Sequence, residues 1–198
     1  MTKKAAVLAV SMLAALSLSA AAHAAPFLFA GPAANNVDTD PGTQVVLAVG
    51  TAGLISDLNV SVNITGGHME DFDLFLTSPA GTVVQFRADF AGDQNPFAHI
   101  DSPLNATFDD ESATPHSAQN GGTAVGTFQP WSALSAFDGE NLLGNWTLTI
   151  SDTFVPNEGD DLVSWSISGE ARTVPEPTTL ALLGLGLAGL AASRRRKQ

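Results

Sequence analysis

Residues 143–152 read LGNWTLTISD, and this stretch decides the fold class. Trp146, Leu148 and Ile150 alternate with hydroxyl-bearing residues along it. Side chains on a β-strand point alternately to opposite faces, so the alternation predicts a strand with one buried face and one face in water. Trp146 is then predicted to be a core residue, because a large aromatic ring stabilises a protein most where it is buried.

The same alternation recurs elsewhere in short runs, which Gly, Pro, Asn and Asp separate. The runs are residues 44–49, 58–64, 72–77, 82–86 and 163–168, the last of which contains Trp165. Several short alternating strands with turn residues between them predict an all-β fold, a single antiparallel β-sandwich of the jelly-roll type. Residues 88–129 are rich in Asp, Asn, Pro and Gly, and they predict an elaborated loop region with some short strands.

The first 24 residues have the order of a secretory signal peptide. Two lysines precede an apolar run, and the triplet AHA that ends at Ala24 fits the small-x-small cleavage rule. We expect signal peptidase to cut after Ala24 or Ala25. Residues 25–42 then predict an extended lead-in, which leaves residues 43–172 as the domain.

The charge of the chain is distributed very unevenly. Nineteen of the twenty acids but only two of the eight basic residues lie between residues 25 and 175, a formal charge of −17. A body this acidic repels nucleic acid and anionic lipid, which argues against both as partners. The chain has no cysteine, so disulfides, thiol nucleophiles and thiolate metal sites are excluded.

Five segments, taken in order, resemble the P domain (P/Homo B) that follows the catalytic domain of subtilisin-like proprotein convertases. They are HMEDFDLFLTSPAGT at 68–82, TFDDESA at 107–113, LSAFDGEN at 134–141, LGNWTLTISD at 143–152 and DDLVSWSI at 160–167. The resemblance implies a β jelly roll, in agreement with the strand pattern. It also implies an accessory module without the peptidase chemistry.

The chain is predicted not to be an enzyme, because it has no room for the catalytic domain of a convertase. It contains no Gly-x-Ser-x-Gly elbow. A triad assembled from scattered residues stays formally open, since triads are defined by geometry. A two-carboxylate glycosidase also stays open, although no pair of acids stands out.

The resemblance further implies a structural calcium ion, because P domains often resemble calcium-binding jelly rolls. The acids at the most family-like positions are the candidate ligands: Asp71, Asp73, Asp109, Asp110 and Asp152. Converging carboxylates repel one another unless a cation neutralises them, and carboxylate oxygen is a ligand that calcium prefers. The alternative is that these acids are solvated strand ends and turn caps.

The last 26 residues, 173–198, form a separate unit. It consists of the tripeptide Pro175, Glu176 and Pro177, an apolar segment at 178–193, and a basic end of Arg194, Arg195, Arg196 and Lys197. The apolar segment spans about 24 Å as a helix, whereas a bilayer core needs about 30 Å. We predict a short transmembrane helix that pauses in the membrane, with the basic residues as a cytoplasmic stop.

This unit resembles the PEP-CTERM sorting signal of Gram-negative bacteria. The resemblance implies export through the inner membrane, a transient stay in it, and cleavage by an exosortase near residues 175–177. It also implies a mature form at the cell surface or in the exopolysaccharide matrix. The alternative is a simple C-terminal anchor.

These observations predict an exported non-catalytic module that acts in structure or adhesion, with exopolysaccharide or a surface protein as its partner. Trp131 follows a proline in a loop, and it is the best candidate for an exposed ring that could stack on sugar. One alternative is an accessory domain that regulates a separate subtilisin-like endopeptidase. Another is an unrecognised hydrolase.

Overall fold

The structure is a computed structural model, and it describes residues 23–37, 42–66, 71–88, 103–119, 124–152 and 159–172. Most of the predicted signal peptide and all of the tail from residue 173 onward lie outside these ranges, the predicted transmembrane helix included. Within the ranges, no helix has the length and apolar character to cross a membrane.

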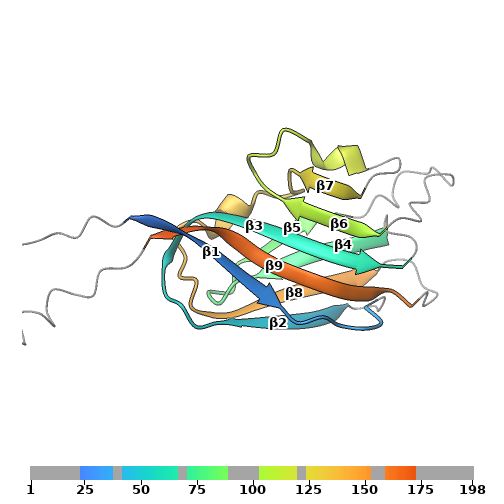
Figure 1. Cartoon of the computed structure of the whole chain (residues 1–198), viewed down its shortest axis with the longest axis horizontal. Helices are drawn as coiled ribbons and strands as arrows, with labels where there is room; N and C mark the ends of the chain where they lie inside the picture. Colours follow the sequence, from blue (N-terminus) through green and yellow to red (C-terminus); the bar gives the residue numbers. More distant parts are fainter. Residues whose placement is uncertain are drawn as a thin grey trace, which may run out of the picture.

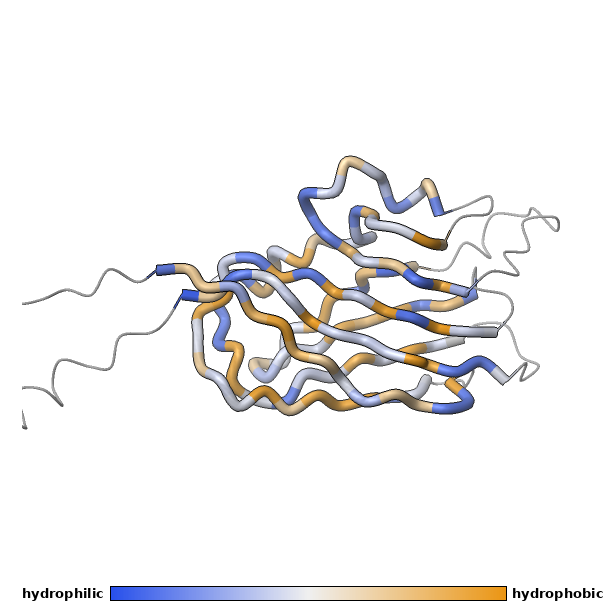
Figure 2. Tube along the Cα trace, viewed as in Figure 1, coloured by the Kyte–Doolittle hydropathy of each residue, from blue (hydrophilic) through white to orange (hydrophobic). Residues whose placement is uncertain are grey.

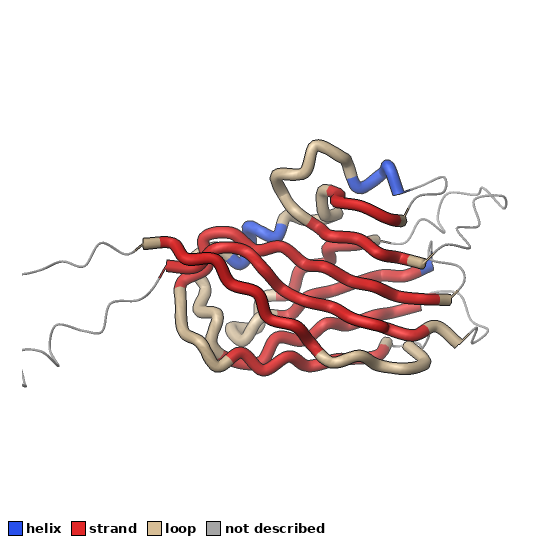
Figure 3. Tube along the Cα trace, in the orientation of Figure 1, coloured by secondary structure: helices blue, strands red, loops and turns tan. Residues whose placement is uncertain are grey.

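Two β-sheets pack face to face (Figure 1). The first sheet has the order β1-β9-β3-β6-β7, and the second has the order β2-β8-β4-β5. The strands are β1 (Ala24–Gly31), β2 (Thr43–Val49), β3 (Leu54–Thr65), β4 (Phe72–Thr77), β5 (Val83–Arg87), β6 (Leu104–Phe108), β7 (Val125–Phe128), β8 (Gly144–Asp152) and β9 (Asp161–Arg172). Two short 3-10 helices, η2 (His116–Gln119) and η3 (Leu134–Phe137), lie in the connections that precede β7 and β8 (Figure 3).

The prediction of an all-β antiparallel sandwich is confirmed by the strand pairing. Every pairing is antiparallel except that of β6 with β7, which is parallel. The predicted loop region at 88–129 carries β6, η2 and β7. Apolar and polar residues alternate along the strands, as Figure 2 shows, so each sheet turns one apolar face inward.

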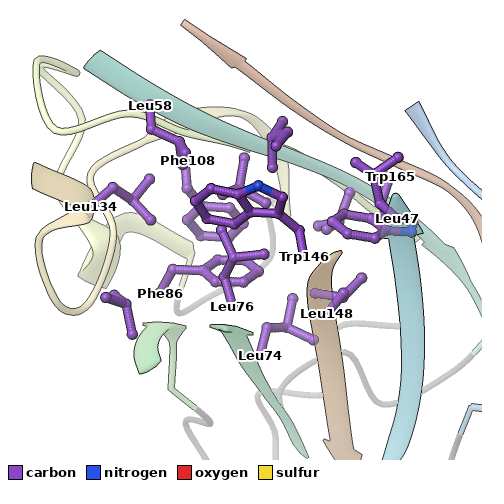
Figure 4. Close-up of a cluster of buried hydrophobic side chains, with 14 of the residues drawn as sticks. Leu47, Leu58, Leu74, Leu76, Phe86, Phe108, Leu134, Trp146, Leu148 and Trp165 are labelled. Atoms are coloured by element: carbon purple, nitrogen blue, oxygen red, sulfur yellow. The ribbon is translucent and has the colours of Figure 1, made fainter. Parts of the chain in front are cut away.

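The strand that contains Trp146 lies at the centre of the second sheet. On one side of β8, Trp146 is the register partner of Leu47 in β2. On the other side, Leu148 is the register partner of Leu76 in β4. Trp146 is fully buried between the sheets (Figure 4), as predicted. Its indole Nε1–H donates to the carbonyl oxygen of Leu142 at 3.0 Å, so the polar atom of the ring is satisfied within the core.

The second buried tryptophan belongs to β9, which lies between β1 and β3. Trp165 is the register partner of Gly31 in β1 and of Val62 in β3. It is 2% exposed, so the prediction that it is a core residue is also confirmed.

The structure differs from the predicted lead-in at Ala24–Gly31. These residues form edge strand β1, which pairs along its whole length with β9. Phe27 and Phe29 stack on each other with ring centroids 5.8 Å apart and pack against the core, while Leu28 is exposed. The segment reads AAPFLFAG, which lacks polar alternation and contains a proline, so it gave no strand signal. Proline is tolerated on an edge strand because its missing N–H can face solvent.

Candidate functional site

Asp110, one of the predicted calcium ligands, caps the start of η3. Its Oδ1 accepts a hydrogen bond from the Leu134 N–H at 2.9 Å, and its Oδ2 accepts one from the Ser135 N–H at 2.8 Å. The first N–H groups of a helix have no partner within the helix, so a carboxylate that accepts from them stabilises it. Both oxygens of Asp110 are therefore engaged in a structural role.

The other predicted ligands are also engaged or lie elsewhere. Asp109 Oδ1 accepts from the Glu111 N–H at 2.8 Å, which makes a local turn. Asp73 Oδ1 accepts from Nε2 of Gln85 at 2.8 Å. Asp71 is buried immediately before β4, and the backbone of Asp152 pairs with Phe72.

The four predicted ligands whose side chains the structure describes, Asp71, Asp73, Asp109 and Asp110, are not grouped as one metal site. Asp71 and Asp73 lie at the start of β4 in the second sheet, whereas Asp109 and Asp110 follow β6 in the first sheet. Among the residues that the structure describes, no three His, Cys, Asp or Glu side chains are grouped to hold a metal ion. The geometry fits the turn-and-cap alternative for Asp109 and Asp110, and calcium binding stays a prediction.

A different group of acids lies around a shallow polar hollow, which we call the acidic hollow. Its lining residues are Ser56, Asp57, Leu58, Asp110, Glu111, Ser135 and Asp138. A β-bulge at Ser56 shifts the register of β3 against β9, so Ser56 and Asp57 both face outward between two buried residues. The bulge brings Asp57 to acids that are far from it in the sequence.

Burial and neighbouring like charges raise the pKa values of two acids in this hollow. Burial raises the pKa of the Asp57 carboxyl, and four acids raise it further, namely Asp109, Glu170, Asp138 and Asp110. Burial also raises the pKa of Asp138, with a further contribution from Asp110. Neither Asp57 nor Asp138 could be recognised from the sequence as a member of this hollow, because only the folded chain brings them together.

An aromatic pair occupies a second location, beside β5. The His116 ring on η2 is buried, and its centroid lies 5.4 Å from that of Trp131 with an interplanar angle of 64°. Trp131 itself is 60% exposed, as sequence analysis predicted for this ring. Burial, with the charge of Arg87, lowers the pKa of His116 to about 4, so the imidazole is neutral at pH 7.

Arg87 anchors η2 to the sandwich beneath this pair. Its guanidinium is fully buried, and its Nε donates to Oε1 of Gln119 at 3.2 Å. Its NH1 group donates to the carbonyl oxygen of Phe72. One of the two basic residues of the acidic body is thus a buried structural cation, which holds the 3-10 helix against β4 and β5.

The two ends of the described domain lie side by side. Ala24, at the predicted signal-peptide cleavage site, is the register partner of Arg172, the last residue of β9 (Figure 1). The predicted processing residues 175–177 and the basic residues 194–197 lie outside the described ranges; in the sequence, Pro175 comes three positions after the last residue of β9.

Two family profiles match the chain. The proprotein convertase P-domain matches residues 55–168, and the PEP-CTERM protein-sorting motif matches residues 173–197. No curated protein matches the sequence.

Two similar solved structures are serine proteases of Aeromonas sobria. The protease in complex with its chaperone ORF2 is 17% identical, with a TM-score of 0.43, over 75% of this chain and 28% of that chain. The protease alone is 18% identical, with a TM-score of 0.41, over 74% of this chain and 28% of that chain. These likenesses are too weak to carry a fold or an activity over to this chain.

The P-domain match is more informative than these structural likenesses, because it runs from the beginning of β3 into β9. It takes in both buried tryptophans and the cap that Asp110 makes. It also covers more than half of the sequence. The chain therefore belongs to the proprotein convertase P-domain family.

Proposed function

We propose that this protein is an exported, non-catalytic P domain that a C-terminal signal sorts to the bacterial cell surface or its exopolysaccharide matrix. An exosortase removes the signal, and the released body acts in structure or adhesion. One observation carries the proposal: the match to the sorting motif begins at residue 173, the residue after β9 ends.

The pairing of Ala24 with Arg172 supports this proposal. The chain enters and leaves the sandwich at the same end, and each predicted processing site lies next to that end in the sequence. The domain can therefore fold outside the membrane while its N-terminal or C-terminal segment is still held in the membrane. Pro175 lies three positions after Arg172, a reach of about 10 Å when extended. The enzyme that cuts near residues 175–177 must therefore work close to the folded body.

The structural roles of the acids support a non-catalytic body. Hydrolysis by two carboxylates needs a pair that faces a common substrate. Asp110 accepts backbone hydrogen bonds with both oxygens, and Asp109 and Asp73 each accept one hydrogen bond within the fold. Calcium is not needed for this account, and it enters no step of it.

Replacement of the tripeptide tests the sorting proposal. We expect a variant with Pro175, Glu176 and Pro177 all changed to Ala to remain in the membrane fraction of its host, whereas the parent protein reaches the surface and medium. Glu170→Ala is the matched control, because it removes an exposed acid near the same end without touching the motif. Equal distribution of the tripeptide variant and the parent would contradict sorting through this motif.

Family membership favours a second candidate, an accessory domain that acts with a separate subtilisin-like endopeptidase. The protein captured from spent medium of its host would then carry a serine protease with it. Capture of polysaccharide without protease favours the first proposal over this one.

A further inference from the structure

Trp131 is an exposed indole that the fold holds in place. Its backbone N–H donates to the carbonyl oxygen of Phe86 at 2.8 Å, and the next N–H, that of Ser132, donates to the carbonyl oxygen of Gln85 at 3.1 Å. The edge-to-face contact with the buried His116 ring supports the indole from the protein side. A ring that is fixed before binding loses little conformational entropy when a ligand packs on it.

The surroundings of this ring are polar. Gln129 and Thr114 belong to the two segments that meet here, since the Gln129 N–H donates to the carbonyl oxygen of Thr114 at 2.7 Å. Gln129, Thr114 and Ser132 are all exposed. In segments 114–119 and 129–133, Trp131 is the one exposed large apolar side chain. We call Thr114, Gln129, Trp131 and Ser132 the Trp131 platform.

This combination fits a saccharide better than a protein partner. The centre of a protein interface is a contiguous apolar patch, whereas Trp131 is the one exposed large apolar side chain in segments 114–119 and 129–133. A pyranose ring whose C–H bonds point axially has an apolar face that matches an indole, and its equatorial hydroxyls can bond to amide and hydroxyl side chains such as those of Gln129, Thr114 and Ser132. The strong negative charge of the body disfavours uronic-acid polymers and favours neutral ones.

We propose that the Trp131 platform binds a neutral, equatorially linked pyranose unit of an extracellular polysaccharide. The indole stacks on the sugar ring, and Gln129, Thr114 and Ser132 bond to its hydroxyls. This inference rests on the proposed function, because only delivery to the surface or matrix brings the domain to such a polymer.

Tryptophan fluorescence provides the test, because Trp146 and Trp165 are buried and acrylamide therefore quenches Trp131 selectively. The protein purified from its host is titrated with cellohexaose, with chitohexaose, and with neutral exopolysaccharide from that host. We expect at least one of them to protect Trp131 from quenching, and oligomeric alginate to give no protection. Trp131→Phe should keep most of the affinity measured by calorimetry, and Trp131→Ala should lose roughly tenfold or more.

Val83→Ala is the matched control, because it truncates another exposed apolar side chain and should leave binding unchanged. The proposal is overturned if no neutral saccharide protects the indole, or if Trp131→Ala binds as well as the parent protein. Protection by a host protein instead of a sugar would also overturn it. The cellular location of the Trp131→Ala variant distinguishes a failure of this proposal from a failure of the sorting proposal. A variant that reaches the surface normally but no longer binds sugar has lost the function of the Trp131 platform alone.

Discussion

Gly31→Ala tests whether β1 is an integral part of the sandwich. A Cβ atom added at Gly31 would lie 2.1 Å from both Cε2 and Nε1 of Trp165. That indole is buried between strands and has little room to move, so either the ring shifts or β1 lifts from β9. Position 31 therefore has no room for a side chain.

A shift of the Trp165 ring and detachment of β1 are expected to lower the unfolding free energy by similar amounts. Overpacking a filled core costs about 1–3 kcal/mol of unfolding free energy. Detachment of β1 exposes Phe27 and Phe29, and full burial of a phenylalanine is worth about 1.5–3 kcal/mol. Because these two rings are only half-buried, their loss together amounts to roughly 1.5–3 kcal/mol. We expect Gly31→Ala to lose about 1–3 kcal/mol by either route.

Urea unfolding followed by tryptophan fluorescence measures this loss, with Gly50→Ala as the matched control. A Cβ at Gly50 meets nothing within 4 Å, so that change should be neutral or slightly stabilising. In a Trp165→Phe background the clashing atoms are gone, and the cost of Gly31→Ala should shrink. Equal effects at the two glycines, or an undiminished cost in that background, would refute the packing argument.

Three further predictions concern buried and charged groups. Trp146→Phe should lower the unfolding free energy by roughly 2–4 kcal/mol in urea, because it leaves a cavity and an unpaired Leu142 carbonyl; a loss below about 1 kcal/mol would contradict the buried contact. The raised folded-state pKa of Asp57 means that stability falls as the pH rises from its ordinary value of 3.8 through that pKa. Asp57→Asn, which can still accept a hydrogen bond from the side-chain amide of Asn59, should therefore raise the melting temperature at pH 7 but not at pH 3. No gain at pH 7 would contradict the raised pKa that burial and the neighbouring acids give Asp57. The lowered pKa of His116 predicts an NMR titration midpoint near 4, and it predicts that stability is lost as the pH falls from 6.5 to about 4. A midpoint near 6.5 would mean that the ring is solvated.

The strands that sequence analysis predicted correctly are those whose alternation the core dictates. β8 and β9 lie at the centre of the packing, and Trp146 and Trp165 mark their inward faces. A one-residue shift would move such a ring into solvent, so the pattern in the sequence is strict. The exposure of Trp131 could also be predicted, because a proline precedes it in a loop.

Strand β1 could not be predicted in the same way. It lies at a sheet edge, and its contribution depends on pairing with a strand about 140 residues away rather than on its own pattern. The acidic hollow was missed for a related reason, since it depends on a bulge in β3 and on the approach of η3. The predicted calcium ligands, in contrast, were chosen by family position, which does not reveal that Asp110 has both oxygens occupied by backbone donors.

The mass of the mature protein, purified from the surface and medium of its host, distinguishes a cleaved sorting signal from a permanent anchor. We expect a form that begins after Ala24 or Ala25 and ends near Pro177, either free or carrying an adduct. A form that still ends at Gln198 would contradict it, because the tail would then be a permanent anchor rather than a sorting signal.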